Sequence, residues 1–357
     1  EVATGEEALA WKRGHDDFPF VYTLASFRRF ALGQPKIGKI IVRFYLNEEM
    51  LLSAYERGEI EAMNAIDPLV AEKLVAAGAR IITTTLPRVF GVFFNQNQQK
   101  LFTRAEVRAA LNMSVNREAI LAEVFRNYGK PLLNPLPFTL LPISKSSTTT
   151  DPTELLERSG WKRNSETGKW ELPGKKKDEA PLLLRFTLTT SDAPELKRVA
   201  ELVKRDWEKL GAVVELKVFE WGALNQSVIR PRDYEALLFG EIVGRNPDLY
   251  SFWHSTQRLD PGLNIALYTN VAVDKILDEV KVASTTEDRL SGYQAFRTEI
   301  EKDKPAVFLY APDFLYLIPS RIAGIDLGII NTSAERFLGI HNWYVKTDQV
   351  WPIFANH

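Results

Sequence analysis

The stretch from residue 37 to residue 85 decides the fold class. It reads IGKIIVRFYLNEEMLLSAYERGEIEAMNAIDPLVAEKLVAAGARIITTT. Three segments rich in β-branched residues predict strands, and two segments with helical apolar spacing predict helices. The strands are expected at 37–46, 60–66 and 81–85, and the helices at 47–57 and 68–77. This alternation of strand and helix is the pattern of an α/β layer, so the fold class is α/β.

Two capping boxes predict where further helices begin. Thr103 is followed three residues later by Glu106, and Asp192 is followed in the same way by Glu195. In this arrangement each side chain can satisfy a free backbone N–H of the first helical turn. The second box opens a long helix that ends before Gly211 and whose apolar face consists of Leu196, Val199, Val203, Trp207 and Leu210.

The rest of the chain continues the same alternation. Further strands are expected at 182–190, 213–221, 234–243 and 306–311, with a near continuation at 314–319, and further helices near 116–125, 273–283 and 287–302. The proline-rich stretch 131–152 cannot be regular structure for long. We interpret it as an ordered crossing loop, with disorder as the alternative.

Composition excludes several classes of protein. The 357 residues hold 45 Lys and Arg against 46 Asp and Glu, a net charge of −1, so no global charge attracts nucleic acid or an anionic membrane. The longest apolar run, 306–311, is far shorter than the roughly 20 residues that span a bilayer. The absence of cysteine excludes disulfides, thiolate metal sites and cysteine nucleophiles.

Enzyme and cofactor motifs are absent from the sequence. It contains no dinucleotide-binding, P-loop, zinc-protease or nucleophile-elbow motif. The four histidines, His15, His254, His341 and His357, are far apart, so a histidine metal site or catalytic triad would require distant segments to converge. The sequence predicts no cofactor, no metal site and no catalytic residue.

Aromatic residues gather near the ends of the predicted strands. They occur at Phe93, Phe94, Phe219, Trp221, Phe239, Tyr250–Trp253, Tyr268 and Tyr310. Core packing explains most such residues. Aromatic side chains beside polar groups at strand ends can also line a ligand cleft, which is where α/β sheets bind ligands.

Several segments together resemble one known family. VFFN at 92–95, LFTRAEVRAALN at 101–112, NREAI at 116–120 and NPDLYSFWHS at 246–255 occur in that order. They are similar to the extracellular solute-binding proteins of family 5, the oligopeptide- and dipeptide-binding proteins of ABC transporters. The resemblance runs in order from about residue 24 to residue 344, and collinear matches are more specific than any single motif.

The resemblance implies a periplasmic-binding-protein-like type II fold with two lobes joined by crossover strands. Residues 1–92 and 313–357 are then expected to form a partial lobe I, and residues 93–312 to form lobe II. The chain would leave the first lobe near 91–95 and return near 308–314. In the family, an initial part of the first lobe precedes the segment that resembles residues 10–46. The chain is therefore expected to be the carboxy-terminal portion of such a protein or a naturally shortened member, with the first lobe incomplete.

The resemblance also implies a function. The expected role is the periplasmic or extracellular solute-binding component of an ABC importer, which captures a peptide or similar small solute in an interlobe cleft and presents it to the transporter permease. It would not be an enzyme and would not bind nucleic acid, and it would meet the membrane only through the permease or a lipid anchor outside this segment. A small-substrate hydrolase and a fragment not competent for binding are the alternatives.

The ligand site departs from the family pattern in one respect. Peptide binders of the family often place a Trp, and an Asp that pairs with the peptide amino terminus, before the turn that resembles Asn246-Pro247. Val243 stands where the Asp would fall, and Glu241 can take over that role, with an exposed strand-end charge as the alternative. Arg245 can hold a carboxylate or form an ion pair within the protein. The residues expected to line the site are Asn95, Trp221, Glu241, Arg245, Asn264 and Tyr310.

Overall fold

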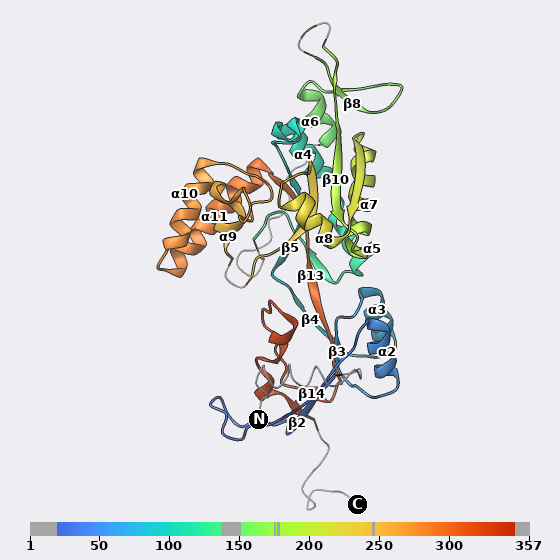
Figure 1. Ribbon diagram of the computed structural model, residues 1–357, viewed down its shortest axis with the longest axis vertical. Coiled ribbons are helices and arrows are strands. Elements are labelled where there is room, and N and C mark those ends of the chain that lie inside the picture. The colour runs from blue at the N-terminus through green and yellow to red at the C-terminus, as the bar shows by residue number, and fades with distance from the viewer. Residues whose placement is uncertain (1–19, 137–150, 175, 177–178, 245–246, 347–357) are drawn as a thin grey trace, which may run out of the picture. The chain divides into compact units, whose positions relative to one another are not determined.

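The computed structural model describes residues 20–136, 151–174, 176, 179–244 and 247–346. The chain divides into two compact units, which we describe separately (Figure 1). Unit 1 is residues 1–86 with 313–357, and unit 2 is residues 87–312. The first boundary between the units lies at Leu86–Pro87, and strand β5 (Arg88–Phe94) pairs along its length with β12 (Ala236–Ile242) inside unit 2.

The centre of unit 2 is a twisted mixed sheet. Its strands lie in the order β11 (Val213–Phe219), β10 (Arg185–Ser191), β12, β5 and β13 (Ala306–Leu317). β10 runs parallel to both β11 and β12, whereas β5 runs antiparallel to β12 and to β13. The short strand β6 (Gly129–Pro131) pairs with β13 at Tyr310–Pro312.

Alternating side chains of this sheet serve two cores, one on each face. Val92 and Phe94 of β5 belong to the first core, and Phe93 between them belongs to the second. The first core is covered by α4 (Ala105–Ser114), α5 (Arg117–Phe125), α6 (Pro152–Arg158) and α7 (Pro194–Leu210), and the second by α9 (Leu249–Trp253), α10 (Val271–Val282) and α11 (Thr286–Asp303) (Figure 1). Helices therefore cover both faces, as in other α/β layers.

Short elements complete unit 2. A small antiparallel sheet consists of β7 (Lys162–Arg163), β8 (Trp170–Leu172) and β9 (Leu182–Leu183). Unit 2 also contains the short helical segments η1 (Lys100–Thr103), α8 (Trp221–Ala223), η2 (Leu224–Ile229) and η3 (Ser255–Gln257).

The described part of unit 1 contains the end of the large sheet around β13, two two-stranded sheets and two α-helices. β13 lies between β3 (Met63–Asn64) and β4 (Ile81–Thr85), β1 (Phe20–Ala25) pairs with β2 (Lys39–Phe44), and β14 (Ile322–Ala323) pairs with β15 (Tyr344–Val345). The helices are α2 (Glu48–Glu56) and α3 (Pro68–Ala76), and η4 (Ser333–Phe337) and η5 (Ile340–Asn342) are single turns. A small core holds Leu86, Phe314, Tyr316, Ile318, Ile330 and Trp343.

One long strand belongs to both units. The first part of β13, up to Pro312, pairs with β5 and β6 of unit 2, and the part from Asp313 pairs with β3 and β4 of unit 1. The sequence predicted two separate apolar segments here, and they form a single strand. The chain therefore passes between the units twice, at Leu86–Pro87 and within β13.

The two predicted capping boxes are wrong. The hydroxyl of Thr103 bonds within the preceding 3₁₀ turn, and α4 follows Arg104, whose side chain makes no capping bond. α7 follows Ala193 rather than Asp192, with Pro194 in the first turn. Because a proline has no N–H and a φ suited to the first turn, it can start the helix without a side-chain cap. The apolar face predicted for α7 is confirmed.

The loop predicted at 131–152 lies mostly outside the described residues, which resume at Asp151. Within the described part of the chain, no helix is both long and apolar enough to cross a membrane.

Candidate ligand-binding site

The carboxyl ends of three parallel strands meet at one edge of the sheet in unit 2. β10 ends at Ser191, β11 at Phe219 and β12 at Ile242, and the register pairs Ser191 with Phe219. Ligands of α/β sheets bind outside the carboxyl ends of such strands. The residues at and just after these three ends are therefore the candidate site.

An aromatic pair occupies this edge. The rings of Trp221, just after β11, and Phe239, near the end of β12, lie parallel with centroids 5.6 Å apart and an interplanar angle of 7°. Trp221 is 56% exposed, and Phe239 packs against the core beneath. The pair thus forms a flat apolar surface of which one ring is open to a binding partner.

The backbone around Trp221 is fixed by Glu220. Its carboxylate accepts hydrogen bonds from the backbone N–H groups of Gly222 and Ala223, at 3.0 and 3.2 Å, as the cap of α8. These bonds lower the pKa of Glu220. Because the cap holds the first turn of α8, it also holds the Cα of Trp221 in place, although the ring is largely exposed.

Glu241 lies on the same face of β12 as Phe239, two residues further along. Its side chain is 4% exposed, and neither carboxylate oxygen has a hydrogen-bond partner among the described residues. Burial raises the pKa of Glu241 well above its usual value, because a carboxylate loses its hydration there. This excludes the alternative of an exposed strand-end charge. A buried, unpaired carboxyl group is the type of group that a ligand cation can satisfy.

Three other residues expected to line the site have structural roles inside unit 2. Asn95 is fully buried; its side-chain amide donates to the backbone oxygen of Arg232 at 2.9 Å, and its carbonyl oxygen accepts from the backbone of the following turn. Tyr310 is 1% exposed, and its ring stacks on Phe90 with centroids 4.9 Å apart. Asn264 is fully buried in the polar network described below. We do not include these three in the candidate site.

Arg245 lies outside the described residues. Of the expected set, Trp221 lies just after the end of β11 and Glu241 lies near the end of β12. Phe239 was not in that set, although the sequence carried a signal for it. It stands two positions before Glu241, so that in a strand both side chains point to the same face.

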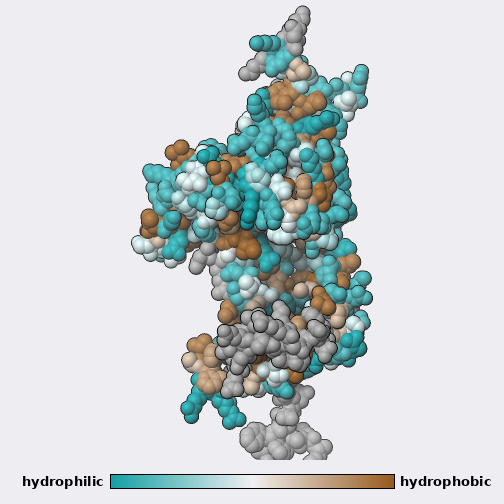
Figure 2. All heavy atoms as spheres, viewed as in Figure 1, coloured by the Kyte–Doolittle hydropathy of each residue, from teal (hydrophilic) through white to brown (hydrophobic). Residues whose placement is uncertain are grey.

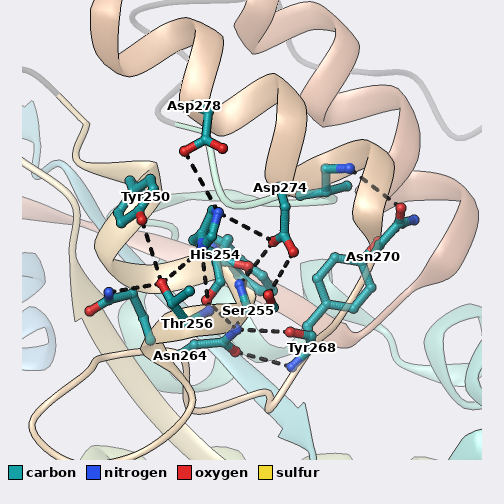
Figure 3. Close-up of polar contacts among 12 residues, drawn as sticks. Tyr250, His254, Ser255, Thr256, Asn264, Tyr268, Asn270, Asp274 and Asp278 are labelled. Carbon is teal, nitrogen blue, oxygen red and sulfur yellow. Dashed lines mark hydrogen bonds and ion pairs between the residues drawn. The ribbon is translucent and has the colours of Figure 1, made fainter.

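A polar cluster lies between α9 and α10 (Figure 3). The amide of Asn264 donates to the backbone oxygen of Tyr268 at 3.0 Å and lies within reach of the backbone oxygens of Trp253 and His254. Its carbonyl oxygen accepts from the backbone N–H of Tyr268 at 3.1 Å. Asn264 thus closes the loop between α9 and α10, and both polar atoms of its side chain already have hydrogen-bond partners within the protein.

Asp274 of α10 joins this loop to the helix. It accepts from the backbone N–H of Ser255 at 2.9 Å and from the Ser255 hydroxyl at 2.6 Å. The Nε2 atom of His254 lies 3.8 Å from carboxylate oxygens of both Asp274 and Asp278, while its Nδ1 accepts from the backbone of Thr256. His254 is 7% exposed and stacks on Tyr250. The cluster is a loop anchor, and among the described residues no group of His, Asp and Glu is arranged to hold a metal ion.

Comparison with known proteins identifies relatives. Residues 21–260 match the model of the bacterial extracellular solute-binding proteins, family 5 Middle. The oligopeptide-binding protein AppA of Bacillus subtilis is 25% identical over 303 residues, which cover 82% of this chain and 54% of that protein. A di/tripeptide-binding protein of Pseudomonas aeruginosa is 25% identical over 316 residues, covering 86% and 56%. The chain thus spans about half the length of these relatives.

Solved structures show the same fold. Bacillus subtilis AppA in complex with a nonapeptide matches with a TM-score of 0.64 and 22% identity, over 91% of this chain and 64% of that chain. HbpA2 from Haemophilus parasuis matches with a TM-score of 0.75 and 15% identity, over 92% and 62%. These are type II binding-protein folds, so the expected fold class is confirmed.

Proposed function

Because the chain belongs to the bacterial extracellular solute-binding proteins of family 5, we propose that it captures a peptide or similar small solute for an ABC importer. The observation that carries the proposal is the Trp221–Phe239 pair at the carboxyl ends of the parallel strands of unit 2. The proposal includes handover of the solute to a transporter permease outside the cytoplasm, with any membrane attachment made by parts outside this segment.

The exposed ring of Trp221 supports binding of solutes with apolar groups. A large aromatic side chain left 56% exposed gains free energy when a ligand covers it, and its rigid ring loses little conformational entropy on binding. The Glu220 cap reduces that entropy cost further, because the backbone of Trp221 is already fixed in the free protein.

Glu241 supports a preference for a solute that carries an ammonium group. In the free protein, burial raises the pKa of its carboxyl group and so favours the neutral form. Entry of a cation would compensate for the lost hydration of the carboxylate, so that Glu241 could ionise and accept a charge-assisted hydrogen bond. We propose that Glu241 takes the role that an Asp at position 243 has in the resembling peptide binders.

The test is calorimetric titration with tetraalanine and with N-acetyl-tetraalanine as probes. Tetraalanine is expected to bind and the acetylated peptide to bind at least about tenfold more weakly, since one lost charged hydrogen bond is worth about 1.5–3 kcal/mol. Trp221→Ala should also weaken binding about tenfold or more, as buried aromatic contacts usually do. Phe27→Ala, at an equally open aromatic of unit 1 that is 66% exposed, is the control and should leave the affinity unchanged.

Other outcomes separate this proposal from its alternatives. Unchanged affinity of Trp221→Ala would remove the aromatic pair from the site. A chain that binds no peptide and carries no ligand in native mass spectrometry would be the fragment that is not competent for binding. Turnover of a panel of peptides, esters and glycosides would favour the hydrolase; we propose that binding occurs without turnover.

A further inference from the structure

Strand β11 forms one edge of the large sheet in unit 2. Its seven residues, VVELKVF at Val213–Phe219, pair in parallel with β10 along their whole length. Among the described strands, β11 has no neighbour on its other side. An edge of this length is a ready template for another strand, because its outward backbone groups have no partner within the sheet.

The hydrogen bonds at the two ends of β11 show which of its backbone groups point outward. The N–H of Val213 donates at 2.8 Å to the main-chain oxygen of Leu184, directly before β10. The main-chain oxygen of Phe219 accepts at 2.8 Å from the N–H of Asp192, directly after β10. Because the backbone groups of successive residues in a strand point to opposite sides, the odd-numbered residues of β11 bond towards β10. The residues whose N–H and C=O groups point outward are Val214, Leu216 and Val218.

The side chains of β11 carry one charge of each sign on a single face. Glu215 and Lys217 are two positions apart, so both point to the same side of the sheet. Both are exposed, and neither forms an ion pair with another residue in the described part of the chain. On the opposite face, Val214 and Leu216 pack against the first core, while Val218 remains 40% exposed.

We propose that two copies of the chain associate through β11, with the two strands antiparallel about a twofold axis at Leu216. Leu216 then exchanges two backbone hydrogen bonds with Leu216 of the partner subunit. Val214 does the same with Val218 of the partner subunit. Every outward backbone group of the strand finds a partner, and the two sheets become one continuous sheet across the dimer.

The charges of β11 favour this register over its neighbours. With the axis at Leu216, Glu215 lies opposite Lys217 of the partner subunit, and the symmetry repeats the pair. The Cα atoms of such directly opposed residues are about 4.5 Å apart, so opposite charges attract and like charges repel. The adjacent registers that also pair the outward groups place the axis at Glu215 or at Lys217, which sets two like charges against each other. Charge complementarity therefore selects a single register and a second copy as the partner.

A contact of this kind is narrow and depends on backbone groups more than on apolar area. Figure 2 shows mostly hydrophilic side chains, in teal, on the visible face of unit 2, with apolar side chains, in brown, between them. Val218 gains an apolar neighbour in the dimer, since it lies opposite Val214 of the partner subunit. Interfaces that bury less than about 1,200 Å² are usually weak and reversible, and a single strand pair belongs to this class. We therefore expect a dimer that forms at high concentration and dissociates on dilution.

The test is sedimentation velocity of the chain over about 10–500 µM, a range in which small interfaces associate reversibly. The parent should shift from monomer to dimer. Glu215→Lys and Lys217→Glu each create two like-charge pairs in the interface, so each should weaken self-association about tenfold or more. An equimolar mixture of the two variants should dimerise again, because the mixed dimer contains two pairs of opposite charge.

Two matched controls separate the strand from net charge. Glu279→Lys and Lys275→Glu, at exposed side chains of α10, change the net charge by the same amounts and should leave self-association unchanged. A thermal melt checks that each variant is folded. If either single variant of β11 does not fold, the double variant Glu215→Lys/Lys217→Glu replaces it. The double variant restores both opposite-charge pairs and should dimerise as the parent does.

Several results would overturn the proposal. A parent that stays monomeric over the whole range is one, and folded single variants whose mixture does not dimerise are another. A dimer that Glu215→Lys and Lys217→Glu leave intact would place the contact on another surface of the chain. Slow amide exchange at Leu216 in a monomeric parent would mean that another segment of the same chain covers the edge, and it would contradict the proposal equally.

Discussion

The guanidinium of Arg117 donates from Nε to the main-chain oxygen of Phe308 at 2.7 Å, where β13 shifts its register against β5. It also donates to the main-chain oxygen of Leu132 at 3.0 Å and to the side chain of Asn112. Burial lowers the pKa of Arg117 to about 10. One cation therefore satisfies backbone oxygens from segments that are far apart in the sequence.

Arg117→Met should lower the free energy of unfolding by about 2–4 kcal/mol, because it leaves buried carbonyl oxygens without donors. The measurement is urea denaturation followed by tryptophan fluorescence. Arg198→Met, at an exposed side chain that pairs with Glu123 and Glu201, should change it by about 0.5 kcal/mol or less. Equal effects of the two substitutions would contradict the structural role of Arg117.

Ser255→Ala should lower the free energy of unfolding by about 1–2 kcal/mol. It removes the 2.6 Å hydroxyl donor to Asp274 that ties the loop to α10, and bonds to charged acceptors are stronger than neutral ones. Ser284→Ala, an exposed serine ahead of α11, should be neutral. A thermal melt of both variants decides the matter, and a neutral Ser255→Ala would mean that the loop is held without this bond.

Glu241 makes stability depend on pH in an unusual direction. Since its pKa is raised in the folded protein, the folded state keeps a proton that the unfolded state releases above its own pKa, near 4.5. Stability from this group is therefore complete below that pH and declines as pH rises towards the folded pKa, by up to about 1.4 kcal/mol per pH unit.

Glu241→Gln should remove this decline, so that the variant gains stability relative to the parent between pH 5 and pH 7. Glu215→Gln, an exposed position on β11, should follow the parent at every pH. The measurement is the difference in denaturation midpoint across that range. A difference between parent and Glu241→Gln that does not vary with pH would show that Glu241 is ionised in the free protein.

Gly211→Ala should cost about 1–3 kcal/mol of unfolding free energy. Gly211 ends α7 with φ 112°, and an added Cβ would come within 2.9 Å of the main-chain oxygen of Gly168. Gly38→Ala is the control, because a Cβ there meets no atom within 4 Å. The measurement is differential scanning calorimetry of the two variants. Equal losses of stability in both would contradict the role of the Gly211 backbone.

Local patterns in the sequence predicted most of the elements. The spacing of apolar residues placed α7 and its buried face, and the β-branched run at 81–85 coincides with β4. The capping boxes failed at Thr103 and Asp192 because each helix begins one residue later, after Arg104 or Ala193, with Pro194 in the first turn of α7. Of the strand predicted at 60–66, only the two residues of β3 form a strand. Among the described strands, β3 has a partner on one side only.

The site was harder to predict than the fold. The sequence shows that Asn95 and Asn264 are polar. It does not show that in the folded protein their side-chain amides bind backbone oxygens, of Arg232 for Asn95 and of Tyr268 for Asn264. The burial of Glu241 likewise depends on how its strand is covered, which no local pattern encodes. Trp221 was expected to line the site because it is an aromatic residue near the end of a predicted strand, and it lies two residues after β11.

Because β13 belongs to both units, unit 1 can be completed only late in synthesis of the chain. The first segment of unit 1 ends at Leu86, but its partner segment begins only at Asp313. At ribosomal speeds of about 5–20 residues per second, the interval between them lasts roughly 10–45 s. During that time the nascent β4 has no β13 beside it, so unit 1 is the part of the chain for which we expect a chaperone to be needed until translation reaches the end.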